Sequence, residues 1–457
     1  MDSIRGYIEK NKERFLEELF GLIRIPSVSA DKRNREEMYS AAEYLKENII
    51  SSGADKAEVV KTSGWPVVFG EKLIDSKLPT ILVYGHYDVQ PPDPHEEWKS
   101  LPFEPEIREE KIYARGADDD KGQLFMQLKA FEYMVAENKL PCNVKFIIEG
   151  EEEIGSAALK KFCLRNGQLL SADVILVSDT TMLSLDTPSL TIGLRGLAYF
   201  EITVTGPNRD LHSGLYGGAV NNPCNVLADI ISGMKDDKGK ITIPGFYDSV
   251  KEVDKGEREL LNKVPLDEDT LITNIGIPEF YGEEGYTTIE RLGIRPSLDV
   301  NGIWGGFMEE GAKTILPANA SAKISMRLVP DQDTEKIEKI FKAHLENISP
   351  PGVSIRIKTL HGGNAYVAPW ESKEIQAAIS SIEKTFGKKP LPIRGGGSIP
   401  VIAAFDEVLG IKAVLLGFGL ETDAIHSPNE NFPLQSFYKG IETIPWFYHF
   451  YSESYNL

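Results

Sequence analysis

The stretch Ile81-Leu82-Val83-Tyr84-Gly85-His86-Tyr87-Asp88 joins an uninterrupted apolar run to polar residues that can bind a metal. A short apolar run without alternation is typical of a strand that is buried on both faces of a sheet. Two more such runs follow, at residues 144–148 and 174–177, and the three runs alternate with helical patterns around 124–135 and 157–163. This alternation predicts parallel βαβ units.

Candidate ligands follow each of the three predicted strands. His86 and Asp88 come after the first strand, Glu149 to Glu153 after the second, and Asp179 after the third. In an open α/β sheet the ligand site lies at the carboxyl ends of the strands. We therefore expect these segments to converge on one crevice.

An acidic loop supplies a further set of ligands. Arg115-Gly116-Ala117-Asp118-Asp119-Asp120-Lys121-Gly122 places three consecutive carboxylates between glycines, directly before a helical pattern. Such a cluster repels itself unless a cation holds it. Carboxylates mixed with imidazole are the ligands expected for Zn²⁺, Mn²⁺ or Co²⁺, and a shared carboxylate allows two metals. The pattern therefore favours a two-metal hydrolase.

Each of these residues also has a structural alternative. The acidic loop is compatible with a solvated turn that caps the next helix, because acidic residues favour helix N-termini. His86 and Asp88 are compatible with a hydrogen-bonded pair at a strand end, and adjacent glutamates are common on protein surfaces. The residues themselves do not select Asp119 over its two acidic neighbours, nor Glu152 over Glu153.

The character of the sequence changes near Leu194. Polar and apolar residues alternate in residues 199–205, 322–329 and 353–359, which predicts an antiparallel sheet with one solvated face. Asp333-Thr334 is a plausible cap for an amphipathic helix between the last two strands. After this α+β insert, a helix at 372–386 and a buried strand at 413–416 lead towards His426. We therefore expect a catalytic domain in residues 1–191 and 365–457, interrupted by a smaller domain in 192–364.

The composition excludes several classes of protein. The 457 residues include 69 acidic and 50 basic ones, and the formal charge of -19 disfavours binding to nucleic acids or anionic membranes. The N-terminus lacks an apolar signal core, and no apolar run reaches membrane-spanning length, so we expect a cytoplasmic protein. The 3 cysteines show no CxxC pairing and predict neither disulfides nor a zinc knuckle. We expect four histidines to be structural or solvated: His95, His344, His361 and His449.

The ordered motifs of the chain resemble those of a known family. This family comprises the co-catalytic two-metal metallopeptidases, including cytosolic non-specific dipeptidase, carnosinase and acyl-amino-acid hydrolases, and the chain is most similar to its dipeptidase branch. The resemblance covers nearly the whole chain. It is carried by nine motifs in order: GHYDVQP, ARGADDDKG, EGEEEIGS, VSDT, DLHSGLYGG, GAKTILP, RLVPD, GGGSIP and AIHSPNE.

The resemblance implies how the metals are held. Asp119 would bridge both metals. His86 and Asp179 would complete one site, and Asp88 would support His86. Glu153 and His426 would complete the other site. The resemblance also implies an α/β, mostly parallel-sheet peptidase domain, which is interrupted by a smaller α+β, ferredoxin-like lid that forms a homodimer.

The catalytic and substrate-binding roles are likewise implied by the resemblance. Glu152 would act as general base on a water between the metals and then protonate the leaving amine. His212 would reach the partner subunit's active site and stabilise the oxyanion. Three residues would bind the C-terminal carboxylate of the substrate: Thr314, Arg327 and Ser398.

The expected function is hydrolysis of the amide bond in dipeptides or small peptides with a free C-terminal carboxylate. The expected cofactors are two divalent ions, with Zn²⁺ favoured over Mn²⁺ or Co²⁺. One alternative is an N-acyl-amino-acid deacylase or desuccinylase with the same metals. A second alternative is a non-catalytic binding relative, against which the complete set of ligands argues.

Two positions depart from the pattern of the most similar dipeptidases. Gly395 stands where these commonly have an acidic residue just before GGS, and this affects the expected substrate preference. Asp118 replaces a small polar residue, and it adds negative charge beside the metals.

Overall fold

The computed structural model describes residues 3–396 and 399–455, and these form two compact units. The first unit takes its described residues from Met1–Ile192, Ala368–Ile393 and Val401–Leu457. The second unit takes its own from Gly193–Val367 and Arg394–Pro400. The first unit is therefore discontinuous in sequence, because the chain leaves it after Ile192 and later returns.

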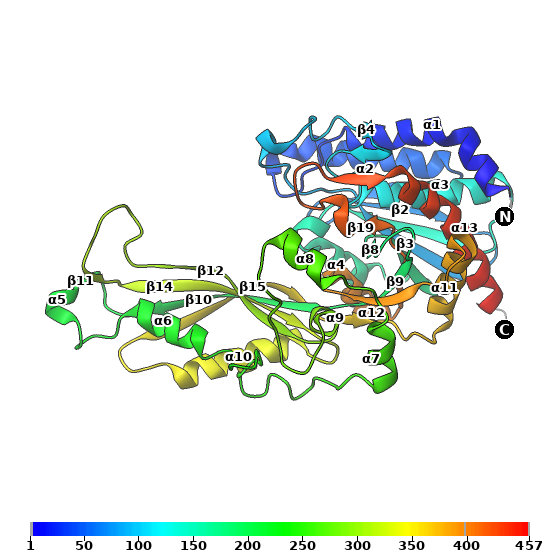
Figure 1. Ribbon diagram of the computed structural model, residues 1–457. Helices are drawn as coiled ribbons and strands as arrows, with labels where there is room; N and C mark the ends of the chain where they lie inside the picture. Colours follow the sequence, from blue (N-terminus) through cyan, green and yellow to red (C-terminus); the bar gives the residue numbers. More distant parts are fainter. Residues whose placement is uncertain (1–2, 397–398, 456–457) are drawn as a thin grey trace. The chain divides into compact units, whose positions relative to one another are not determined.

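The first unit is built on a mixed sheet, of which Figure 1 labels β2, β3 and β9. From one edge, the nine-stranded sheet runs in the order β1-β2-β6-β3-β7-β18-β9 and continues to β16 (Tyr366–Val367), and β17 (Leu391–Gly395) also pairs with β9. In chain order these strands are β1 (Lys56–Val60), β2 (Val67–Lys72), β3 (Thr80–His86), β6 (Asn143–Glu149), β7 (Val174–Val177), β9 (Ser189–Leu194) and β18 (Ala413–Leu415). The neighbours β6, β3, β7 and β18 run parallel. The flanking pairs β1–β2, β2–β6 and β18–β9 are antiparallel. The predicted parallel sheet is thus confirmed at the centre, while its flanks make it mixed.

Helices cover both faces of the central strands. Phe131 of α3 (Lys121–Ala136) packs edge-on against Phe146 of β6, with ring centroids 5.2 Å apart. On β3, Tyr84 makes a similar contact at 5.3 Å with Phe405 of α12 (Pro400–Leu409). Val83 is the register partner of Phe146, so Phe146 and Tyr84 point to opposite faces. The apolar runs are therefore buried on both faces, as predicted.

The remaining elements of the first unit surround this sheet. Its other α-helices are α1 (Ile4–Ile23), α2 (Arg35–Ser51), α4 (Ala157–Arg165), α11 (Lys373–Phe386) and α13 (Leu434–Tyr455). A small antiparallel sheet joins β4 (Glu106–Arg108), β5 (Lys111–Tyr113) and β20 (Asn431–Pro433). Two short parallel strands, β8 (Thr181–Met182) and β19 (Gly419–Leu420), form another. Cys142 and Cys163 are buried free thiols.

The second unit has a four-stranded antiparallel sheet with the order β12-β14-β10-β15. Its strands are β10 (Gly196–Thr205), β12 (Ser297–Gly305), β14 (Asn319–Leu328) and β15 (Ser354–Gly363). Helices α6 (Pro223–Ser232) and α10 (Thr334–Ile348) pack on this sheet. The chain order β10-α6-β12-β14-α10-β15 with this strand order is a ferredoxin-like βαββαβ topology. The side chain of Asp333 caps α10 by accepting from the backbone N–H of Lys336, as predicted.

Other parts of the second unit were not predicted. Strand β12 lies at an edge of the sheet and is largely exposed, so its sequence lacks the alternation of a half-buried strand. The smaller elements are β11 (Leu211–His212), α5 (Ser213–Tyr216), α7 (Lys255–Leu261), α8 (Glu268–Ile275), α9 (Thr288–Gly293), β13 (Ile315–Leu316) and β16 (Tyr366–Val367). Across the described ranges of both units, every helix is too short or too polar to span a membrane.

Candidate metal centre

Three strands of the first unit end at the same edge of the sheet. His86 is the last residue of β3, and its register partner Glu149 is the last residue of β6. The neighbouring parallel strand β7 ends at Val177, two residues before Asp179. Because these strands are parallel, their carboxyl ends bring the three following segments together, as the sequence predicted.

The acidic loop joins this edge from β5. Its tight path requires glycine at two positions: Gly116 has a φ of +82°, and a Cβ at Gly122 would overlap the carbonyl oxygen of Ala117. Helix α3 begins at Lys121, directly after the three aspartates. The loop therefore holds Asp119 at the start of a helix that packs against β3.

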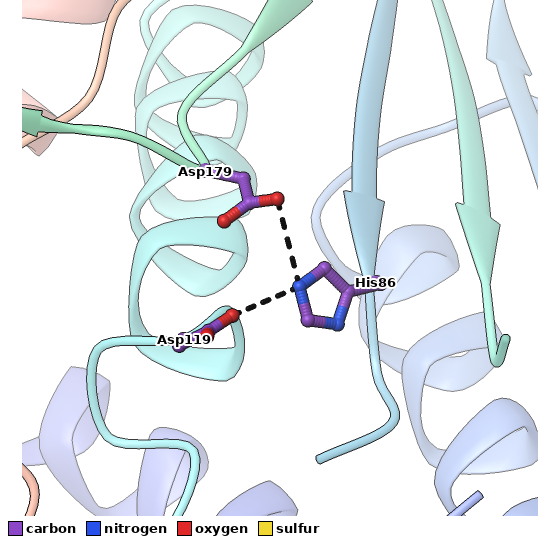
Figure 2. Close-up of side chains that lie close together, drawn as sticks. All are labelled: His86, Asp119 and Asp179. Carbon is purple, nitrogen blue, oxygen red and sulfur yellow. Dashed lines mark ion pairs between the residues drawn. The ribbon is translucent and has the colours of Figure 1, made fainter. Parts of the chain in front are cut away.

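His86, Asp119 and Asp179 form a first group of candidate ligands (Figure 2). The Nε2 atom of His86 lies 3.0 Å from Oδ1 of Asp119 and 3.7 Å from Oδ2 of Asp179. The opposite ring nitrogen, Nδ1, donates to the backbone oxygen of Asp88 at 3.0 Å. This bond fixes the imidazole so that Nε2 faces the two carboxylates.

Asp119, Glu153 and His426 form a second group. The Nε2 atom of His426 lies 2.8 Å from Oδ2 of Asp119 and 3.2 Å from Oε2 of Glu153. Asp119 thus directs one carboxylate oxygen to each group. Neither Asp118 nor Asp120 belongs to a group among the described residues.

The two groups fit divalent metal ions. Within each group the ligand atoms all lie within 4.8 Å of one another, and they combine imidazole nitrogen with carboxylate oxygen. The buried Nε2 of His86 faces the carboxylates of Asp119 and Asp179, so it is placed as a metal-ligand atom beside two others. A carboxylate shared between two groups is what a pair of metals a few ångström apart requires.

The short distances between these ligand side chains shift their pKa values. Burial acts to raise the pKa of Asp119, but hydrogen bonds to His426 and His86 outweigh it and hold that pKa below its ordinary value. Hydrogen bonds to Asp119 and Glu153 raise the pKa of His426 to about 10. Without a metal, protonated histidines therefore supply the positive charge that these carboxylates need.

Glu152 and Asp88 lie beside the ligands. Glu152 opens a 3₁₀ turn, Glu152–Ile154, and its carboxylate belongs to neither ligand group in the region that the structure describes. Burial, with the nearby carboxylates, raises its pKa well above the ordinary value. The buried carboxylate of Asp88 accepts from the backbone N–H groups of Glu152 and Glu153, both at 3.2 Å. Asp88 therefore orients this turn. Its backbone oxygen accepts from Nδ1 of His86, and its carboxylate Oδ1 lies 3.5 Å from the same nitrogen.

Gln90 is a further member of the site that was not predicted from the sequence. Its Nε2 donates to Oε2 of Glu153 at 2.8 Å, which orients this candidate ligand. Gln90 lies four residues after His86 on the same segment. A glutamine amide is not part of a metal-binding sequence pattern. Only the position of Gln90 within the motif GHYDVQP could have indicated its role.

Two of the predicted substrate-binding residues lie together in the second unit. His212 is exposed on β11, which pairs with β13, and its Nδ1 accepts from the backbone N–H of Gly214. The backbone oxygen of Thr314 accepts from the N–H of Ser213 at 3.1 Å. His212 and Thr314 thus form one local structure, at the end of the sheet where β14 begins (Figure 1).

Arg327 lies at the other end of β14, opposite Leu197 and Ser297 in the register. It is partly buried, and this burial lowers its pKa. The eight residue steps from Asn319 to Arg327 correspond to roughly 26 Å of strand. Arg327 is therefore far from Thr314 within one chain. Ser398, predicted as a third carboxylate-binding residue, lies outside the described residues.

The two positions that depart from the pattern of the most similar dipeptidases, Asp118 and Gly395, have different surroundings. Asp118 is fully buried beside Asp423, and its carboxylate oxygens have no hydrogen-bond partner within residues 3–396 and 399–455. Burial raises the pKa of Asp118 well above its ordinary value. The backbone oxygen of Gly395 accepts from the N–H of Arg195, so this position is held by the second unit.

Comparisons with known proteins agree with this geometry. A model of the peptidase family M20/M25/M40 matches residues 82–445. The Cys-Gly metallodipeptidase DUG1 of Candida albicans is 32% identical over 471 residues, which cover 98% of this chain and 96% of that protein. The Beta-Ala-His dipeptidase of Homo sapiens is 29% identical over 466 residues, which cover 98% of this chain and 92% of that protein.

A solved structure shows the same likeness in three dimensions. The M20 family metallo-carboxypeptidase Sso-CP2 from Sulfolobus solfataricus matches with a TM-score of 0.87 and 36% sequence identity. The match covers 96% of this chain and 99% of that chain. The likeness thus extends over both units rather than over the ligand motifs alone.

Proposed function

The chain belongs to the peptidase family M20/M25/M40, and from this we propose that it cleaves dipeptides, or small peptides, that have a free C-terminal carboxylate. The observation that carries the proposal is Asp119, which directs one oxygen to each of two ligand groups. The names of the relatives, a Cys-Gly metallodipeptidase and a Beta-Ala-His dipeptidase, support short substrates.

Two metal ions, held by the groups that share Asp119, would polarise the scissile carbonyl and lower the pKa of a water. The mixture of imidazole and carboxylate favours Zn²⁺, while Mn²⁺ or Co²⁺ would also suit it. His86 and Asp179 would hold one ion, and Glu153 and His426 the other. Asp88 and Gln90 would keep His86 and Glu153 in place.

Glu152 is the proposed general base and acid. It lies next to Glu153 but outside both ligand groups, so its carboxylate is available for proton transfer. Burial raises the pKa of Glu152, and this favours a group that accepts a proton from water and then delivers it to the leaving amine. Asp88 would hold this carboxylate in place through the backbone of residue 152.

The substrate-binding residues support a site that two subunits share. A dipeptide cannot span the roughly 26 Å of β14 that separates the His212 and Thr314 end from Arg327. If all three residues contact one substrate, they must come from two copies of the chain, with His212 and Thr314 on one copy and Arg327 on the other. We assign Arg327 to the carboxylate of the substrate in its own subunit, and His212 and Thr314 to the site of the partner.

The second unit would accordingly serve as both lid and dimerisation domain. Its edge strand β12 exposes three large apolar side chains, Val300, Ile303 and Trp304, which are 38%, 58% and 37% exposed. An exposed edge strand presents unpaired backbone groups as well as apolar surface, and natural proteins usually cover such an edge. A second copy of the chain is the proposed cover. The cytoplasmic location stays a prediction.

A substrate panel tests this function against its rivals. Purified protein, loaded with Zn²⁺, Mn²⁺ or Co²⁺, should hydrolyse Ala-Ala and related dipeptides faster than N-acetyl or N-succinyl amino acids. The reverse order would identify a deacylase or desuccinylase. A protein that binds two metals but turns over neither class of substrate would support the non-catalytic alternative.

A further inference from the structure

We propose that Glu430 is a positioning residue of the metal centre, and that its carboxylate fixes the loop that carries Asp119. The inference rests on the proposed two-metal function, because its object is the placement of the shared ligand. Glu430 itself belongs to neither ligand group in the described ranges.

The carboxylate of Glu430 accepts four hydrogen bonds, and all of them come from the acidic loop. Its Oε2 accepts from Nη1 of Arg115 at 2.7 Å and from the backbone N–H of Gly116 at 3.0 Å. Its Oε1 accepts from the backbone N–H groups of Asp118 at 3.0 Å and of Asp119 at 3.1 Å. Glu430 is fully buried and Arg115 is 1% exposed, so water does not compete for these bonds.

This pattern differs from that of a simple buried ion pair. One arginine would neutralise the charge of Glu430, yet three of the four donors are main-chain N–H groups of the loop. Successive backbone N–H groups that converge on an anion form a rigid concave site, which here sets the path of the loop. The bond to the N–H of Asp119 holds the backbone of the shared ligand itself.

Glu430 also links two of the three chain segments that supply ligands to the second group, those of Asp119 and His426. It lies four residues after His426, and its backbone oxygen accepts from the N–H of Ala114 at 3.1 Å. Beyond it, β20 pairs with β5, which leads into the acidic loop. Its side chain and its backbone therefore both hold the segment of His426 against the segment of Asp119.

The bridging position of Asp119 depends on such placement. Its two oxygens lie 3.0 Å from His86 and 2.8 Å from His426, so a small shift of the loop would lengthen one contact or both. Glu430→Gln keeps the size of the side chain but places an NH₂ group against N–H donors. Replacing a residue that orients a metal ligand typically weakens metal binding by about 10- to 100-fold.

The test measures Co²⁺ binding to the full chain after the metals have been removed. Glu430→Gln should weaken Co²⁺ binding by about 10- to 100-fold in competition with a chelator, and it should change the visible spectrum of bound Co²⁺. Glu132→Gln is the matched control. The Glu132 carboxylate on α3 accepts from Arg14, Lys129 and Tyr7, and from no residue of the acidic loop.

A purely structural role would lower the melting temperature of the metal-free variant and leave the affinity and spectrum of Co²⁺ unchanged. Wild-type affinity and spectrum in Glu430→Gln would therefore overturn the inference. If that variant does not fold, Glu430→Asp serves instead, because it keeps the charge but shortens the side chain. Wild-type Co²⁺ binding by folded Glu430→Asp would equally overturn the inference. Failure of the wild-type chain to bind two Co²⁺ ions would instead refute the metal centre.

Discussion

The imidazole of His426 lies 2.8 Å from the carboxylate of Asp119, although 307 residues separate them in the sequence. The other oxygen of Asp119 faces His86. One side chain thus connects a loop before α3, the end of β3 and a turn near the C-terminal helix. In the proposed mechanism, this arrangement separates the binding of the metals from the proton transfer assigned to the adjacent Glu152.

Substitution at these two positions should therefore have different effects. Glu152→Gln should leave the metal content nearly unchanged and lower kcat by at least about 10²-fold, because an amide cannot accept the proton of the attacking water. Asp119→Asn should instead lose metal, since an amide is a poor ligand to two cations. Metal analysis of both variants, with kcat on Ala-Ala, checks the assignment. Loss of metal in Glu152→Gln with full retention in Asp119→Asn would reverse it.

The central strands of the sheet could be predicted from the sequence because each of them has a recognisable local pattern. The runs that became β3 and β7 are apolar throughout, and the run of β6 is apolar except for Lys145, since helices cover both faces of the sheet. Each run is followed by polar residues. Strand β12 gave no such signal, because an exposed edge strand needs no alternation. Gln90 and Glu430 were not predicted from the sequence either. Each acts on a ligand through a hydrogen bond that forms only when distant segments meet.

The choice among adjacent carboxylates could not come from composition or spacing. Asp118, Asp119 and Asp120 are the same residue type, so the sequence alone does not separate them. In the folded protein their carboxylates point to different neighbours. Asp119 faces both histidines, Asp120 accepts from the backbone N–H of His86 at 3.1 Å, and Asp118 lies against Asp423. Before the structure, only the resemblance to a family selected Asp119.

Metal binding should become tighter as the pH rises. In the metal-free protein, hydrogen bonds to Asp119 and Glu153 raise the pKa of His426 to about 10, so near neutral pH this imidazole is protonated. A metal needs the neutral imidazole, and binding must release that proton. Raising the pH towards 10 removes the competing proton, so the Kd for Co²⁺ should fall. Calorimetry in buffers of different ionisation enthalpy measures the protons released. His426→Ala should release fewer, and a Kd independent of pH would contradict the argument.

Arg327 on β14 should distinguish substrates with a free C-terminal carboxylate from substrates without one. Arg327→Ala should raise KM for dipeptides with a free carboxylate and have little effect on C-terminally amidated ones, because only the former offer a bidentate, charged partner. Arg356 of β15 is exposed on the same sheet, and Arg356→Ala is the control for a general loss of positive charge. Equal losses on both substrate types would place Arg327 among structural residues.

His212 lies with Thr314 at one end of the second unit's sheet. If His212 acts in the partner subunit, each active site combines Glu152 of one chain with His212 of the other. A heterodimer of Glu152→Gln and His212→Ala then has one site with both defects and one site with neither. Random pairing makes about half of the dimers mixed, so two nearly inactive variants should together recover roughly a quarter of wild-type activity.

Coexpression with two different affinity tags isolates the mixed dimer, whose activity should approach half that of the wild type, since one of its two sites is intact. An inactive mixed dimer would place His212 in its own subunit's site, or outside catalysis.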